Sequence, residues 1–151
     1  MQLLIDADSC PVIDIALFVS SRYEIKPILF CDTSHRIERD NIKTIIVPKG
    51  ADSVDFKLVN MLNKGDLVIT NDLGLAAMCI AKGGFVIDSN GKYLTADNID
   101  SMLGLRHEHG KIRRAGGRVK GPKKRTEKNN IAFEMKFRQI CEQLSERKGE
   151  Q

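Results

Sequence analysis

The sequence has no tryptophan, only two tyrosines and six phenylalanines, and only four cysteines and four prolines in 151 residues. The cysteines form no Cys-x-x-Cys pair, which argues against a structural zinc site and favours reduced, mostly buried thiols. No stretch approaches about 18 uninterrupted apolar residues, and no basic segment precedes an apolar one at the N-terminus. The sequence therefore predicts no membrane span and no signal peptide. We expect a cytoplasmic protein without a membrane partner, whose oligomeric state the sequence does not reveal.

Short apolar runs and helical patterns alternate along the first two thirds of the chain. Five runs have the length and the polar boundaries of buried strands: Leu3–Ile5, Ile28–Cys31, Ile45–Val47, Leu67–Ile69 and Phe85–Ile87. Helical periodicity occupies most of the intervals: Val12–Arg22, Asp52–Asn63, Leu73–Lys82 and Thr95–Leu103. The link between the second and third runs has no strong helical pattern. This alternation predicts an α/β fold with an open, mostly parallel five-stranded sheet and helices on both faces.

The net charge of +4 conceals an uneven distribution of charge. Between Arg106 and Lys128 there are ten basic residues against two acidic ones, so that the rest of the chain is acidic. Several glycines interrupt this segment, and we expect a basic, Gly-rich loop at about 105–128 followed by a C-terminal helix at about 130–147, all within one domain (1–151). A basic segment on an acidic body is expected where a polyanion must approach carboxylates, although a solvated loop would have the same composition. Arg106, Arg113 and Arg118 are the candidate phosphate contacts.

Carboxylates recur where the predicted strands end. Asp6 and Asp8 follow the first strand, and Asp72 follows the fourth. The helix after the third strand begins with Asp52 and Asp55. Each could have a purely structural role, because aspartates just before helices commonly cap backbone amides. In a parallel sheet, however, ligands bind at the carboxyl ends of the strands, where these side chains would converge.

Carboxylates that converge in one pocket repel one another unless a divalent cation neutralises them. Oxygen ligands of this kind suit Mg²⁺ or Mn²⁺, which also bind phosphate oxygens. Such ions activate water and stabilise the leaving oxygen in an in-line displacement at phosphorus. Thr70 and Asn71, at the end of the fourth strand, could position a water or a phosphate, although ending a strand and capping a helix would also explain them.

Several motifs resemble one known family. They are "DADSCPV" at Asp6–Val12, "GADSVDFKLV" at Gly50–Val59, "GDLVITNDLGLA" at Gly65–Ala76, "NGKYLTADNI" at Asn90–Ile99 and a late "GP" at Gly121–Pro122. Together they resemble the YaiI/YqxD family of bacterial proteins, which is considered part of the PIN-like nuclease superfamily. The resemblance implies a PIN-like sheet of strand order 3-2-1-4-5 with acidic residues at its carboxyl edge.

The resemblance also implies roles for individual acids. Asp6 corresponds to the PIN aspartate of the first strand, Asp72 to the one after the fourth strand, and Asp55 to the helix acid. Asp88 is a candidate for the last acid of the pattern. The glutamate usual in the PIN helix is absent, and Asp8 is an addition to the pattern.

These observations predict a metal-dependent nuclease that uses Mg²⁺ or Mn²⁺ to hydrolyse phosphodiester bonds of RNA, which is favoured over DNA as the nucleic-acid partner. The predicted catalytic and metal-binding residues are Asp6, Asp8, Asp55 and Asp72, with Asp52 as a further metal ligand. One alternative is a non-catalytic nucleic-acid-binding protein. A less favoured alternative is a haloacid-dehalogenase-like phosphatase, with Asp6 as nucleophile and Asp8 as acid/base.

Overall fold

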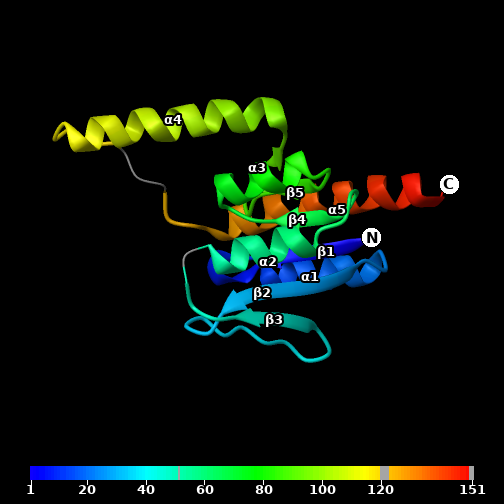
Figure 1. Cartoon of the computed structure of the whole chain (residues 1–151). Helices are drawn as coiled ribbons and strands as arrows, with labels where there is room; N and C mark the ends of the chain where they lie inside the picture. The colour runs from blue at the N-terminus through cyan, green and yellow to red at the C-terminus, as the bar shows by residue number, and fades with distance from the viewer. Residues whose placement is uncertain (51, 120–122, 150–151) are drawn as a thin grey trace.

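A six-stranded sheet forms the centre of the computed structural model, which describes residues 1–50, 52–119 and 123–149 (Figure 1). Its strands are β1 (Gln2–Asp6), β2 (Lys26–Asp32), β3 (Lys43–Val47), β4 (Leu67–Ile69), β5 (Phe85–Ile87) and β6 (Tyr93–Leu94). The order is β3-β2-β1-β4-β5-β6, and every pairing is parallel except that between β5 and β6. The five predicted strands and the order 3-2-1-4-5 are confirmed.

The sixth strand was not predicted. It has two residues and returns antiparallel to β5 after a turn in which Gly91 adopts φ +87°. A two-residue strand is too short to show an alternating apolar pattern, so periodicity could not identify it. The count of five strands is therefore wrong by one edge strand.

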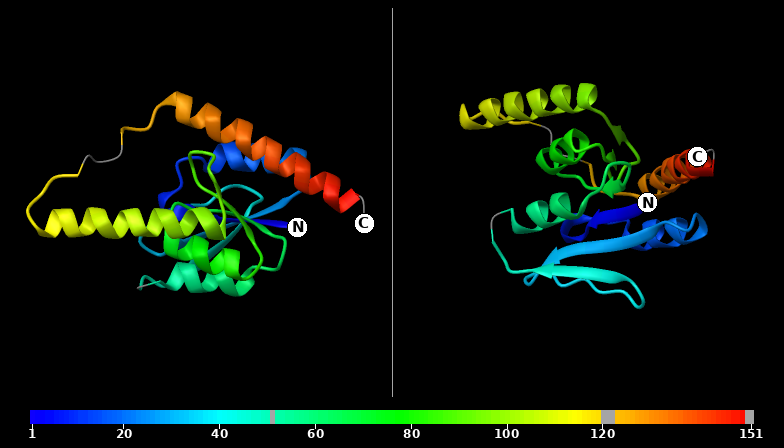
Figure 2. Two further views of the ribbon diagram at one scale, coloured as in Figure 1. Left: turned by 90° about the horizontal axis from the view of Figure 1, so that it is seen from above. Right: turned by 45° about the vertical axis from the view of Figure 1, so that its right-hand side comes forward.

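Helices cover both faces of the sheet (Figure 2). One face carries α1 (Ile13–Arg22) and α5 (Glu127–Gly149), and the other carries α2 (Ser53–Met61), α3 (Leu73–Ala81) and α4 (Ala96–Arg114). Successive strand side chains point to opposite faces, so that Leu3 and Ile5 pack in the first core and Leu4 packs in the second. Burial on both faces explains why the strands are continuous apolar runs rather than alternating ones.

The connection between β2 and β3 contains no helix, in agreement with the weak pattern of that link. After β1 the chain makes one short 3₁₀ turn, η1 (Ala7–Ser9), before α1 begins at Ile13. No helix in the part of the chain that the structure describes is both long enough and apolar enough to cross a bilayer.

The basic segment is more ordered than the sequence suggested. Residues 105–114, predicted as loop, form the second half of α4, whose first turn is closed by a reciprocal capping box between Thr95 and Asn98. Gly104 and Gly110 lie inside this helix, where each costs only about 1 kcal/mol relative to alanine. The helix ends where Gly116 takes φ +84° and the amide of Gly117 bonds to the carbonyl of Ile112. The loop prediction is wrong before this point.

The C-terminal half of α4 extends beyond the body of the molecule, on the side where the strands end (Figures 1 and 2). The chain then returns to α5, which begins three residues earlier than the predicted Asn130. Phe133, Phe137 and Cys141 of α5 are fully buried against α1 and the sheet. Gly121 and Pro122 of the late motif lie outside the described residues.

Candidate functional site

Six aspartates line one cavity at the carboxyl edge of the parallel strands. The cavity has a volume of about 260 Å³, and its lining residues are Asp6, Asp8, Asp32, Gly50, Asp52, Ser53, Val54, Asp55 and Asp72. The six aspartates come from the end of β1 and the η1 turn after it, the end of β2, the N-terminus of α2 and the residue before α3. The structure thus brings together all five aspartates that the sequence singled out as ligands. Their roles as ligands remain a prediction.

Asp6 is the most enclosed of these acids, with 7% of its surface exposed. The hydroxyl of Thr70 donates a hydrogen bond of 2.8 Å to Asp6 Oδ2, and the same hydroxyl accepts one of 3.0 Å from the amide of Asp72. Burial raises the pKa of Asp6, and the nearby charges of Asp8 and Asp72 raise it further, against the bond from Thr70. Because Thr70 is itself 2% exposed, the structure assigns it to orienting Asp6 rather than to touching substrate.

Asp72 stands at the N-cap of α3, where its Oδ1 accepts a 3.1 Å bond from the amide of Leu75. The capping role that the sequence offered for Asp72 is therefore present together with its position in the cavity. One carboxylate serves both purposes because the N-terminus of α3 lies at the sheet edge.

Asp55 projects from the first turn of α2. Burial raises its pKa to about 6, and the carboxylates of Asp72, Asp6, Asp52 and Asp8 contribute in that order. After burial, the neighbouring carboxylates are the second cause of the shift, because each of them disfavours ionisation of Asp55.

Asp52 departs from the expected cap. It occupies the N-cap position of α2 with φ +60°, and its side chain makes no capping hydrogen bond. Aspartate tolerates this left-handed conformation better than most residues do. The outcome is an exposed carboxylate that lines the cavity without a structural role in the helix.

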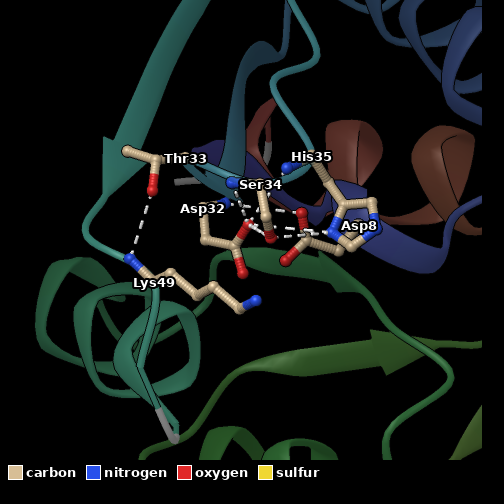
Figure 3. A network of polar contacts seen from close by, with 6 residues as sticks. All are labelled: Asp8, Asp32, Thr33, Ser34, His35 and Lys49. Atoms are coloured by element: carbon tan, nitrogen blue, oxygen red, sulfur yellow. Dashed lines mark hydrogen bonds and ion pairs between the residues drawn. The ribbon is translucent and has the colours of Figure 1, made fainter.

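Asp32 was missed by the sequence analysis, although it ends the second strand as Asp6 ends the first. Its Oδ1 accepts bonds from the Ser34 amide (2.8 Å), the Ser34 hydroxyl (2.6 Å) and the His35 amide (3.1 Å), and its own amide donates to Asp8 Oδ1 at 3.4 Å (Figure 3). The bonds from Ser34 lower the pKa of Asp32. One ligand atom from each of Asp8, Asp32 and His35 lies within 4.8 Å of the others, a spacing compatible with a metal ion. The rule that found Asp6 would also have found Asp32.

Two other predicted residues face a neighbouring loop. Asn71 accepts a 2.9 Å bond from the amide of Ser89, which ties the β4–α3 loop to the β5–β6 turn. Asp88 accepts 2.9 Å bonds from the amides of Asn90 and Lys92 and does not line the acidic cavity. It lies at the end of β5, one strand farther from β1 than β4 is, so this candidate for the last acid of the PIN pattern is not placed with the other acids.

The predicted phosphate contacts lie apart from the acids. Arg106 and Arg113 are exposed on α4, Arg118 is exposed after it, and none of them lines the acidic cavity. Arg125 was not among the predicted contacts. Its guanidinium joins the β5–β6 turn to the start of α5 through the carbonyl of Ser89 (2.7 Å) and the side chain of Asn130 (2.8 Å).

The fold and the cavity define a doubly wound α/β domain with an acidic pocket at the carboxyl ends of its parallel strands. The chain belongs to the family described as "Uncharacterized BCR, YaiI/YqxD family", which it matches over residues 4–143. The family resemblance drawn from the motifs is thereby confirmed.

Similar proteins are named UPF0178 protein. One from Exiguobacterium sibiricum is 47% identical over 140 residues, covering 93% of this chain and 96% of its own. One from Ruminiclostridium cellulolyticum is 47% identical over 134 residues, covering 89% and 88%. A third, from Clostridium acetobutylicum, is 42% identical and covers 93% and 96%. No solved structure gives a significant match.

Proposed function

We propose that this protein is a metal-dependent nuclease of PIN-like type that hydrolyses phosphodiester bonds of RNA in the acidic cavity. The observation that carries the proposal is the convergence of six carboxylates around a space of about 260 Å³. Structural needs account for part of this set but not for all of it, because the carboxylate of Asp52 makes no capping hydrogen bond to α2.

The donor set consists of the carboxylate oxygens that a hard divalent cation such as Mg²⁺ or Mn²⁺ prefers. Among the described residues, Asp8, Asp32 and His35 form the one group whose ligand atoms lie within 4.8 Å of one another. Asp6, Asp52, Asp55 and Asp72 line the same cavity as Asp8 and Asp32 and would have to draw closer to share an ion with Asp8. Burial first, and then the neighbouring carboxylates, raise the pKa of Asp55 to about 6, and a bound cation would favour its ionised form. When bound, the ion would polarise a phosphate oxygen and activate water for in-line displacement.

The protein's own residues prepare this site. Thr70 fixes Oδ2 of the buried Asp6, and the amide of Leu75 fixes Oδ1 of Asp72, so that neither carboxylate must be ordered when the substrate binds. Water is the nucleophile in this scheme: it adds to phosphorus as the bond to the 3′ oxygen breaks, and that oxygen leaves with a proton. No protein nucleophile is required, in keeping with the thiols of Cys10 and Cys79, whose pKa burial raises to about 11 and 12.

Two surface features outside the cavity agree with a polyanionic, single-stranded substrate. The last turn of α4 carries Lys111, Arg113 and Arg114, which supply salt-dependent attraction to a phosphate backbone. Phe56 follows Asp55 on α2 and is 58% exposed. An exposed ring offers a base a stacking surface that a duplex would not use.

The order of the central strands and the positions of Asp6, Asp55 and Asp72 support the PIN-like assignment. The phosphatase alternative is less favoured, because only η1 and three further residues separate β1 from α1 and leave no place for the flap that those enzymes insert. The non-catalytic alternative is favoured by one observation, the placement of the basic residues of α4 outside the acidic cavity.

The proposal is tested by titrating the protein with Mn²⁺ and by following cleavage of a labelled single-stranded RNA. Asp55→Asn removes one charge from the cavity, and Asp100→Asn removes one from an exposed position on α4 as a matched control. We expect Mn²⁺ affinity and cleavage to fall at least tenfold in Asp55→Asn and to remain unchanged in Asp100→Asn. Equal Mn²⁺ binding by the two variants would contradict the proposal, and RNA binding without cleavage would favour the non-catalytic alternative.

A further inference from the structure

A second polar cavity lies beside the acidic one, across the loop that joins β4 to α3. Its volume is about 470 Å³. Asn71, Ser89 and Asn90 line part of it, the segment before α5 contributes Lys123 and Arg125, and the first turn of α5 contributes Asn129. Asn71 lines this cavity and the next residue, Asp72, lines the acidic one, so that consecutive residues of this loop border the two cavities.

Arg125 gives this cavity a positive charge of fixed direction. Its Nε donates to Asn130 Oδ1 at 2.8 Å, and its terminal nitrogens donate to the Ser89 carbonyl at 2.7 Å and to Asn90 Oδ1 at 3.2 Å. All these acceptors are neutral, and the guanidinium forms no ion pair with any carboxylate in the described part of the chain. The charge is therefore oriented without being neutralised.

Lys123 adds a second cation to the lining, and its side chain is exposed. The one acidic residue among the lining residues is Asp88, whose Oδ1 already accepts bonds from the amides of Asn90 and Lys92. With two cations against one carboxylate, the lining has a net positive charge, opposite to that of the neighbouring cavity.

The two cavities share the loop between β4 and α3, since Asn71 lines one of them and Asp72 lines the other. One lining is acidic and the other has a net positive charge. Because a nucleic-acid strand carries one phosphate per nucleotide, a strand with one phosphate in the acidic cavity brings the next phosphates toward the neighbouring cavity.

We infer that the cavity at Lys123 and Arg125 binds a phosphate group of the substrate strand adjacent to the phosphate held in the acidic cavity. The inference rests on the proposed function, because only a chain of phosphates engages both cavities at once. In this proposal Lys123 and Arg125 contact the phosphate directly. Arg106, Arg113 and Arg118, which the sequence predicted as phosphate contacts, contribute only long-range electrostatic attraction.

The test compares Lys123→Gln with Lys124→Gln, since Lys124 is the adjacent exposed lysine and does not line the cavity. Binding of a fluorescein-labelled single-stranded octauridylate is measured by anisotropy in Ca²⁺, across a range of salt concentrations. We expect Lys123→Gln to weaken binding at least fivefold and to reduce the salt slope by about 1, while Lys124→Gln changes affinity less than twofold. Equal losses in the two variants, or no binding by the unaltered protein, would overturn the inference.

Mn²⁺ titration of Lys123→Gln separates the two proposals. Unchanged Mn²⁺ affinity together with weakened octauridylate binding supports the phosphate site, since the acidic cavity is then intact. If the Asp55→Asn experiment fails while the contrast between the two lysines persists, the phosphate site stands and the nuclease proposal falls. If the RNA is cleaved, Lys123→Gln should raise KM and leave kcat unchanged.

Discussion

Thr70 Oγ1 lies 2.8 Å from Asp6 Oδ2 and donates a hydrogen bond to it, across the boundary between β4 and β1. The two residues are 64 positions apart in sequence and both are buried. The same oxygen accepts from the amide of Asp72, so a single hydroxyl links two of the acids of the cavity.

Replacement of Thr70 by valine removes this hydroxyl while conserving the shape of the side chain. We expect a loss of about 1–3 kcal/mol in the free energy of unfolding, because a buried carboxylate loses a donor and the Asp72 amide loses an acceptor. Urea denaturation without divalent cations measures the change. Thr70→Ser retains the hydroxyl and serves as the control. A Thr70→Val protein as stable as Thr70→Ser would show that the bond has no net value.

The ionisation of Asp55 should make the free energy of unfolding depend on pH. Its pKa is raised from 3.8 to about 6, so between those values the native state binds more protons than the unfolded state does. The free energy of unfolding of the metal-free protein should therefore fall as pH rises through this window.

Asp55→Asn removes this contribution and should be more stable than the unaltered protein above pH 6, by about 1 kcal/mol after screening by solvent, and no more stable at pH 4. Chemical denaturation at a series of pH values tests the sign. A stability that is independent of the substitution at pH 7 would contradict the charge repulsion inferred for the cavity.

Divalent cations should stabilise the folded protein. At a concentration one hundred times its Kd, a ligand that binds only the native state contributes about 2.7 kcal/mol, or roughly 5–10 °C in Tm for a chain of this size. We expect Mn²⁺ to produce such a rise, a chelator to reverse it, and Asp55→Asn to lose most of it. A melting temperature indifferent to Mn²⁺ and Mg²⁺ would argue against a metal centre.

Gly91 and Gly104 should respond to alanine in opposite directions. Gly91 has φ +87°, and an added Cβ would lie 3.0 Å from the carbonyl oxygen of Ala132 in α5, so Gly91→Ala should cost about 1–3 kcal/mol. Gly104 lies within α4 with no atom within 4 Å of an added Cβ, so Gly104→Ala should gain about 0.5–1 kcal/mol. Thermal unfolding of the two variants measures both. A destabilised Gly104→Ala would mean that α4 is not helical around Gly104 in solution.

The central strands were predictable because burial on both faces leaves a simple mark, a short apolar run between polar boundaries. Leu67–Ile69 and Phe85–Ile87 were placed to the residue for this reason. The extent of α4 was not predictable in the same way. Its outer half extends away from the body, and its glycines are typical of a loop, so the composition of this segment predicted a loop. The bounds of the helix are instead set by the capping box at its start and by the glycine pair after residue 115.

The candidate site divides along similar lines. Asp6, Asp55 and Asp72 were identifiable because each follows a strand or begins the helix after it, and parallel strands end at one edge. Asp32 follows the same rule and was overlooked, whereas the contacts of Arg125 with Ser89 depend on a docking of α5 that no local pattern records.

By itself the sequence determined the strands, most of their helical connections and the acids at one edge of the sheet. Apolar runs identify buried strands, and the charged residues that follow them lie where parallel strands end. Only the tertiary structure decided which acids line one cavity and that Thr70 donates a hydrogen bond to Asp6. It also decided that Arg125, rather than the arginines of α4, lines the neighbouring cavity. These relationships join residues tens of positions apart, and their geometry depends on how separate elements pack.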